Sequence, residues 1–188
     1  MAEKTVNPAP LGLMGFGLTT ILLNLVNAGL LGSDALGMIL PMGIFYGGLA
    51  QVVAGLLDAK QGNTFGATAF TSYGFFWLSF VAINVMPKLG LTAAPSSTAI
   101  AAYLFVWGLF TALMTIATFK SARALQVVFV SLAILFFILS VGDFTGIAAI
   151  KNVGGFEGLF CGSSAVYLAI AEILNETYGK KVLPVGKK

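Results

Sequence analysis

The sequence predicts an all-α, polytopic membrane protein with six transmembrane helices, and its composition, apolar segments and charge distribution each support this. Hydrophobic residues make up 58% of the 188 positions and charged residues only 9%, with a mean hydropathy of +0.96. A soluble domain carries about 25% charged residues because its surface must be hydrated. A bilayer removes that requirement, since the outside of the protein can be as apolar as its interior. We therefore interpret residues 1–188 as one transmembrane domain.

Six apolar segments are long enough to cross a bilayer as helices, which takes about 17 to 25 residues. Glycines, prolines and charged residues separate them, as expected of loops. No small-residue cleavage site follows the first segment, so we expect it to be retained as a helix rather than removed as a signal peptide. The predicted helices span approximately residues 9–31, 37–57, 65–86, 98–119, 124–142 and 154–175.

Lysine and arginine residues are distributed unequally between the two sides that six helices define. One side carries only Lys88 and Lys151. Positive charge is retained on the cytoplasmic side of a membrane protein, so we predict a cell (plasma) membrane protein with both termini in the cytoplasm. The basic residues on the predicted cytoplasmic side are Lys4, Lys60, Lys120, Arg123, Lys180, Lys181, Lys187 and Lys188.

Small residues recur at helical spacing, most clearly Gly154, Gly158 and Gly162 in the last segment. Helices in lipid associate through close backbone contact, which such residues permit. We interpret these glycines as packing positions, either within one chain or between subunits.

Polar residues inside the apolar segments suggest a pathway for an anion. Phe16, Thr20 and Asn24 share one face of the first segment, and Gln51 lies in the second. Amides are costly in lipid and tend to line interiors or wet cavities. Hydroxyl and amide donors hold an anion weakly enough to release it, whereas a buried Lys or Arg would hold it strongly.

Several other functions lack support in the sequence. Histidine is absent and Cys161 is the single cysteine, so we expect no metal site, no cofactor and no enzymatic activity. The net charge of +3 arises from tails and loops, so nucleic acid is not an expected partner. A non-transporting membrane scaffold or signalling protein remains an alternative. Glu172, near the end of the last segment, is a possible proton site, although an acid at a helix end usually reaches solvent.

Several motifs resemble those of one known family. The segment Asn7-Pro8-Ala9-Pro10-Leu11-Gly12-Leu13 is similar to the signature of the acetate uptake transporter family, which includes the bacterial succinate-acetate permeases. The resemblance continues through Gly15-Phe16-Gly17, Gly62-Asn63-Thr64-Phe65-Gly66 and the segment that ends at Tyr73-Gly74, and it covers nearly the whole chain.

The resemblance implies a homohexamer of six-helix subunits with one pathway in each subunit, carrying acetate and, in bacterial members, succinate. It implies a hydrophobic constriction at Phe16, Tyr73 and Leu132, with Ala165 tuning substrate size together with Leu132. It also places the segment from Asn7 to Leu13 at the cytoplasmic entrance. A passive anion channel and a proton-coupled symporter both remain open, as does the ranking of acetate, propionate, lactate and succinate.

Overall fold

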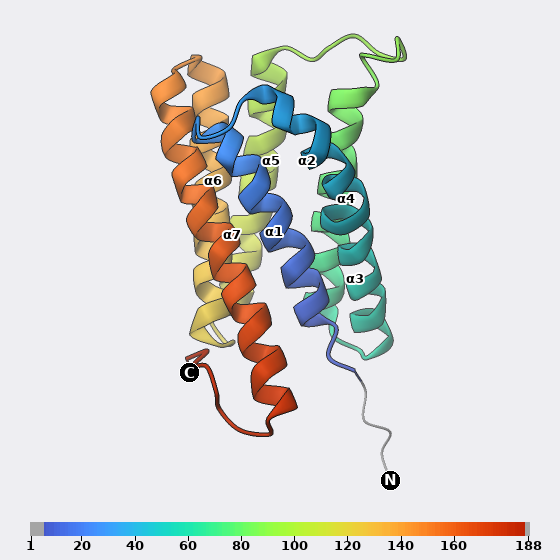
Figure 1. Ribbon diagram of the computed structural model, residues 1–188, viewed down its shortest axis with the longest axis vertical. Coiled ribbons are helices and arrows are strands. Elements are labelled where there is room, and N and C mark those ends of the chain that lie inside the picture. Colours follow the sequence, from blue (N-terminus) through green and yellow to red (C-terminus); the bar gives the residue numbers. More distant parts are fainter. Residues whose placement is uncertain (1–5, 187–188) are drawn as a thin grey trace.

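The computed structural model describes residues 6–186, and in this part of the chain every long element is a helix (Figure 1). Six helical spans are long and apolar enough to cross a membrane. The first is α1 (Ala9–Asn27), and the second consists of η1 (Ser33–Ala35), α2 (Leu36–Met42), η2 (Gly43–Ala50) and α3 (Gln51–Lys60). The remaining spans are α4 (Thr64–Val85), α5 (Ser97–Thr118), α6 (Arg123–Thr145) and α7 (Ala148–Thr177).

The six predicted spans are confirmed, but some boundaries differ from the prediction. The first helix ends at Asn27 rather than at residue 31, and Gly29 follows with a φ of 74° that a helix cannot continue. The last helix begins at Ala148 rather than at residue 154. The charge of Lys151 had suggested a loop there. In the structure Lys151 Nζ donates to Asp143 Oδ1 at 2.6 Å, so the charge is accommodated within the helix.

The second span is interrupted by a π-helical segment, η2, where the sequence had predicted one regular helix over residues 37–57. Pro41 precedes this segment, and Gly43, Gly47 and Gly48 lie buried within it. The wider turn brings the Tyr46 carbonyl against α1, so that a Cβ added at Gly15 would lie 2.6 Å from it. The π segment therefore fits against the helix that carries most of the predicted polar face.

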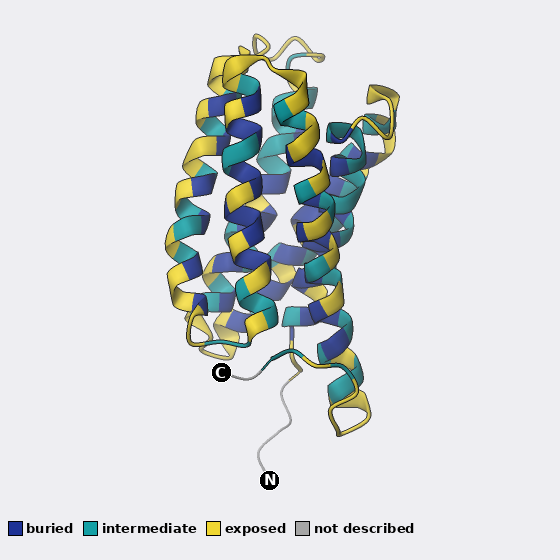
Figure 2. Ribbon diagram, turned by 90° about the vertical axis from the view of Figure 1, so that its left-hand side faces the viewer, coloured by how far each residue is buried: buried dark blue, intermediate teal, exposed yellow. Residues whose placement is uncertain are grey.

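Helices α1 and α7 pack along their glycines, which confirms the packing role expected of these residues within one chain. A Cβ at Gly162 would meet the Gly17 carbonyl at 2.8 Å, and a Cβ at Gly17 would meet that of Gly162 at the same distance. Gly158 accommodates the side chain of Asn24. Figure 2 shows that buried residues face the centre of the bundle while exposed residues follow its outer faces. Apolar side chains such as Phe45 and Leu113 are exposed there, as expected of a surface that meets lipid.

Helix α1 begins and α7 ends at the same end of the bundle, here called the terminal end; the opposite end is called the mouth end (Figure 1). After α7 the chain turns back at the terminal end. Val182 N and Leu183 N donate to Asn175 Oδ1 at 2.6 and 3.0 Å, and Asn175 Nδ2 donates to the Leu183 carbonyl at 2.9 Å. Ala124 N, in the first turn of α6, donates to the Val185 carbonyl at 2.9 Å. The tail thus supplies acceptors to free N–H groups at the start of α6.

Candidate functional site: a cavity that ends at an aromatic constriction

A cavity of about 720 Å³ runs into the bundle from the mouth end, between α1, α4, α5 and α6. Its outer lining comes from the α4–α5 and α6–α7 connections and the neighbouring turns, and includes Pro87, Lys88, Asp143 and Lys151. Its walls are mostly apolar and aromatic, as is usual for sites that take small molecules.

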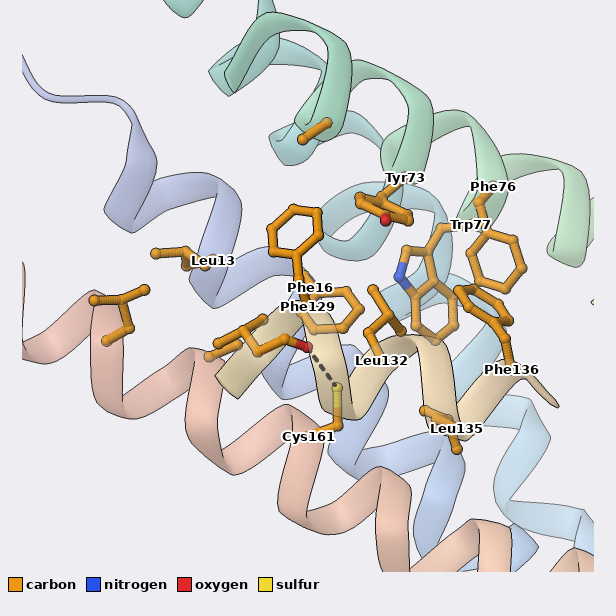
Figure 3. Packing of buried hydrophobic residues seen from close by; sticks show 14 of the residues in the cluster. Leu13, Phe16, Tyr73, Phe76, Trp77, Phe129, Leu132, Leu135, Phe136 and Cys161 are labelled. Atoms are coloured by element: carbon orange, nitrogen blue, oxygen red, sulfur yellow. Dashed lines mark hydrogen bonds between the residues drawn. The ribbon is translucent and has the colours of Figure 1, made fainter. Parts of the chain in front are cut away.

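The lining ends, on the side nearer the terminal end, at Phe16 of α1, Tyr73 of α4 and Leu132 of α6. All three are buried, and the ring centroids of Phe16 and Tyr73 lie 6.3 Å apart. Figure 3 shows the three side chains from different helices turned toward one shared region. Beyond them, Leu13 and Phe129 belong to the packed core and do not line the cavity. Three residues far apart in the sequence therefore form an apolar constriction.

Tyr73 is fixed by a hydrogen-bonded chain that ties it to α5. Its hydroxyl donates to Thr111 Oγ1 at 2.9 Å, and Thr111 Oγ1 donates to the Trp107 carbonyl at 2.7 Å. The rings of Phe110 and Phe129 lie edge-on to it, with centroids at 5.5 and 6.0 Å. Since the hydroxyl is engaged with α5, Tyr73 contributes its ring to the constriction.

The polar wall of the cavity follows α1. Asn24 Nδ2 donates to the Thr20 carbonyl at 2.9 Å, and Asn24 Oδ1 accepts from Asn27 Nδ2 at 3.0 Å. Thr20, Asn24 and Asn27 all line the cavity. The face predicted from helical spacing is therefore present, and its amides are held in place by neighbours on the same helix.

Within residues 6–186, two buried polar groups of this wall have no hydrogen-bond partner: the hydroxyl of Thr20 and the indole N–H of Trp77. Their residues are only 3% and 2% exposed. A buried donor without a partner costs about 1–3 kcal/mol, so such a group is usually satisfied by something. In Figure 3 the Trp77 nitrogen is on the ring edge turned toward Tyr73 and Leu132. The arrangement offers two donors to a small acceptor in the cavity.

Trp77, in the predicted third span, was not among the residues expected to line the pathway. The signal that could have identified it is chemical. A buried tryptophan usually finds a partner for its N–H, and a lipid-facing surface provides none.

Two residues expected to line the pathway lie outside the cavity lining. Gln51 is fully buried, and its Nε2 donates to the Gly47 carbonyl at 2.7 Å, so its amide supports the π segment. Ala165 of α7 is fully buried in the same core cluster that contains Leu132.

The N-terminal motif lies at the terminal end, away from the cavity. The N-cap position of α1 is Pro8, and the side chain of Asn7 accepts the Ala9 N–H at its Oδ1, at 3.1 Å. Asn7 Nδ2 donates to Glu172 Oε2 at 3.0 Å, which ties the start of α1 to the last turns of α7. Asn7, Pro10 and Leu11 also line an open groove of about 760 Å³. Gly12 packs on the Phe70 ring and Leu13 enters the core.

We compared the sequence and the structure with those of known proteins. The sequence model of the GPR1/FUN34/yaaH family matches residues 1–186. The chain is 60% identical over 184 residues to the succinate-acetate/proton symporter SatP of Escherichia coli (strain K12), covering 98% of this chain and 97% of that protein. It is 40% identical over 177 residues to the ammonia transport outward protein 2 of Saccharomyces cerevisiae, covering 91% of this chain and 62% of that protein. The solved structure of the bacterial acetate channel SatP superimposes with a TM-score of 0.95 at 60% identity, over 97% of this chain and all of that one.

Proposed function

We propose that this chain, which belongs to the GPR1/FUN34/yaaH family, is a membrane transporter of small carboxylates, chiefly acetate, with succinate as a further substrate. The relatives named above for succinate and acetate share 60% of its sequence over almost its full length. The chain is therefore a transport protein rather than an enzyme.

The observation that carries the proposal is the pair of unpartnered donors, Thr20 Oγ1 and Trp77 Nε1, in the wall of a cavity that ends at an apolar constriction. A carboxylate is an acceptor with two oxygens, so it can take a hydrogen bond from each donor. Neutral donors bind an anion strongly enough to draw it from water and weakly enough to release it, which conduction requires. A scaffold or signalling protein would have no use for such a cavity.

The constriction would then select among substrates by their size and polarity. Phe16 and Tyr73 can present the positive edges of their rings to an anion, whereas Leu132 offers only apolar surface. Ala165 packs in the same core cluster as Leu132. We propose that the small side chain of Ala165 leaves room for Leu132 to move when a substrate passes, and that Gln51 contributes by supporting the π segment.

The proposal also covers the orientation in the membrane, the cytoplasmic entrance and the oligomeric state. The excess of Lys and Arg at the terminal end supports a cytoplasmic location of both termini in a plasma membrane. The groove lined by Asn7, Pro10 and Leu11 would then lie at the cytoplasmic entrance. We propose a homohexamer with one pathway in each subunit.

The geometry favours a passive anion pathway over proton symport. The charged residues that line the cavity are Lys88, Asp143 and Lys151, all at its mouth. No carboxyl group lines it between the mouth and the constriction, in the part of the chain that the structure describes. Glu172, the candidate proton site, lies at the terminal end in a hydrogen bond with Asn7. A proton bound there would be remote from a substrate held by Thr20.

Two adjacent threonines provide a matched test. The hydroxyls of Thr19 and Thr20 are both buried and find no partner in the described part of the chain, but of the two residues only Thr20 lines the cavity. Valine replaces threonine with little change of shape and removes the hydroxyl. A hydrogen bond to a charged group contributes about 1.5–3 kcal/mol, so Thr20→Val should weaken acetate binding roughly 10- to 100-fold. The KM for acetate flux into liposomes containing the purified variant is the measurement.

Thr19→Val should leave that KM unchanged. Equal KM values for the two variants would show that the Thr20 hydroxyl does not hold the substrate. If the wild-type protein raises acetate flux no further than protein-free liposomes, the transport function itself is excluded.

A further inference from the structure

Among the described residues, the basic residues at the mouth end of the bundle are Lys88 and Lys151, and both line the mouth of the cavity. The other basic residues that the structure describes, from Lys60 in α3 to Lys181 after α7, lie at the terminal end. Lys88 follows α4 and Lys151 lies in the first turns of α7, and both side chains line the cavity. Positive charge is depleted on one side of a membrane protein, and both lysines found on the depleted side of this bundle line the same cavity.

Lys151 is held in place by a partner. Its Nζ donates to Asp143 Oδ1 at 2.6 Å, and the two side chains are 44% and 14% exposed. An ammonium group has three protons, so two remain for other acceptors. Asp143 also lines the cavity, and its negative charge offsets that of Lys151.

Lys88 therefore provides the net charge of the mouth. It is exposed, and in the described residues no ion pair is shown for it. The amide side chains of Asn84 and Asn152 line the same region. The other acidic residues of this half of the bundle, Asp34 and Glu157, do not line the cavity. The mouth thus has a net charge of about +1, with amide groups beside it.

We propose that Lys88, together with the Lys151–Asp143 pair, forms an anion-capture site that takes the ionised carboxylate of the substrate before it reaches Thr20 and Trp77. This rests on the proposed transport function and specifies the form of the substrate. Carboxyl groups titrate near pH 4, so acetate is an anion at neutral pH. Two unit charges about 4 Å apart attract by about 1 kcal/mol in water, which concentrates an anion without trapping it.

Substitutions in this site should alter the capture of the substrate and leave its passage through the constriction unaffected. Loss of the Lys88 charge should raise the KM for acetate about fivefold at low ionic strength, the factor that corresponds to that attraction. The maximal rate should not change, because the constriction is untouched. Salt near 1 M, where charges are screened beyond about 3 Å, should remove the difference from wild type. Asp143→Asn should lower the KM, because it removes the opposing charge.

A charge-exchange experiment at position 88 tests this in one protein. Lys88→Cys is placed in liposomes and treated with a membrane-impermeant methanethiosulfonate that adds either an ethylammonium or an ethylsulfonate group. The ammonium adduct should restore the wild-type KM, and the sulfonate adduct should raise it beyond that of the untreated variant. Cys161 is 0% exposed, so the reagents should not reach it.

Lys120→Cys, at the terminal end, is the matched control, and its KM should not respond to either reagent. The proposal is overturned if the two adducts at position 88 have the same KM at low salt, or if only the maximal rate changes. Absence of acetate flux in the wild-type protein would instead overturn the proposed transport function.

Discussion

The adjacent glycines Gly154 and Gly155 of α7 should respond very differently to substitution by alanine, because Gly154 faces α6 and Gly155 faces the end of α1. A Cβ at Gly155 would meet the backbone of α1, at Ala28 Cα and Asn27 C, each 2.5 Å away. A Cβ at Gly154 would meet Leu139 Cδ2 at 2.8 Å and Ile138 Cγ2 at 3.0 Å. A side-chain end can rotate away, but a backbone cannot move without its helix. Since carbon atoms pack at about 3.5–4.0 Å, Gly155→Ala would separate α1 from α7 by roughly 1 Å.

The expected change in the free energy of unfolding follows from two opposing effects. Overpacking a well-packed interior costs about 1–3 kcal/mol. Alanine is favoured over glycine within a helix by up to about 1 kcal/mol, and this gain applies at both positions. We expect Gly155→Ala to lose about 2 kcal/mol net, and Gly154→Ala to change stability by less than about 1 kcal/mol. For a chain of this size, 2 kcal/mol corresponds to a decrease in Tm of roughly 4–8 °C.

Cys161 provides the assay. It is the single cysteine and is 0% exposed, so a thiol-reactive fluorogenic dye should label it only as the protein unfolds. Labelling is followed during heating of the purified wild type and both variants. If Gly155→Ala melts at or above the temperature of Gly154→Ala, the close backbone contact between α1 and α7 is wrong.

Three further predictions test other parts of the structure. Tyr73→Phe removes a hydrogen bond of about 0.6 kcal/mol but keeps the ring, so acetate flux should stay within about twofold of wild type; Tyr73→Ala should widen the constriction and admit lactate. Asn175→Ala removes three hydrogen bonds to the C-terminal segment, so it should lower the Tm by roughly 4 °C and speed proteolysis of that segment. The control variant Asn152→Ala, at the mouth end, should do neither. Glu172→Gln should leave the dependence of acetate flux on a pH gradient unchanged, and loss of that dependence would identify Glu172 as the proton carrier.

The six spans could be predicted from the sequence because hydrophobicity over the length of a helix is a local property. The place of Lys151 within α7 was not predicted, because its partner Asp143 lies on another helix and only the folded structure brings the two charges together. The π segment was missed for a similar reason. Its glycines are visible in the sequence, but only the contact with Gly15 shows that the wider turn is accommodated.

The candidate site was predictable only where it depends on local sequence pattern and not on tertiary contacts. Thr20 and Asn24 were found because their spacing on α1 is a helical pattern, and both line the cavity. The chemistry of the residues did not single out Leu132, which only the family resemblance indicated. Gln51 seemed a pathway residue because an amide in lipid is costly, but the π segment provides the acceptor that satisfies it. Whether a polar group is satisfied by the protein or left for a ligand depends on tertiary contacts.

The most direct test of the transport function is the flux of labelled acetate into liposomes that contain the purified protein, with a membrane potential and a pH gradient imposed separately. A potential alone should drive acetate at equal pH, and Thr20→Val should slow this flux at low acetate concentration while Thr19→Val does not. Flux driven by the pH gradient and insensitive to potential would show that protons accompany the substrate. Flux no greater than in protein-free liposomes under either gradient would contradict carboxylate transport through this cavity.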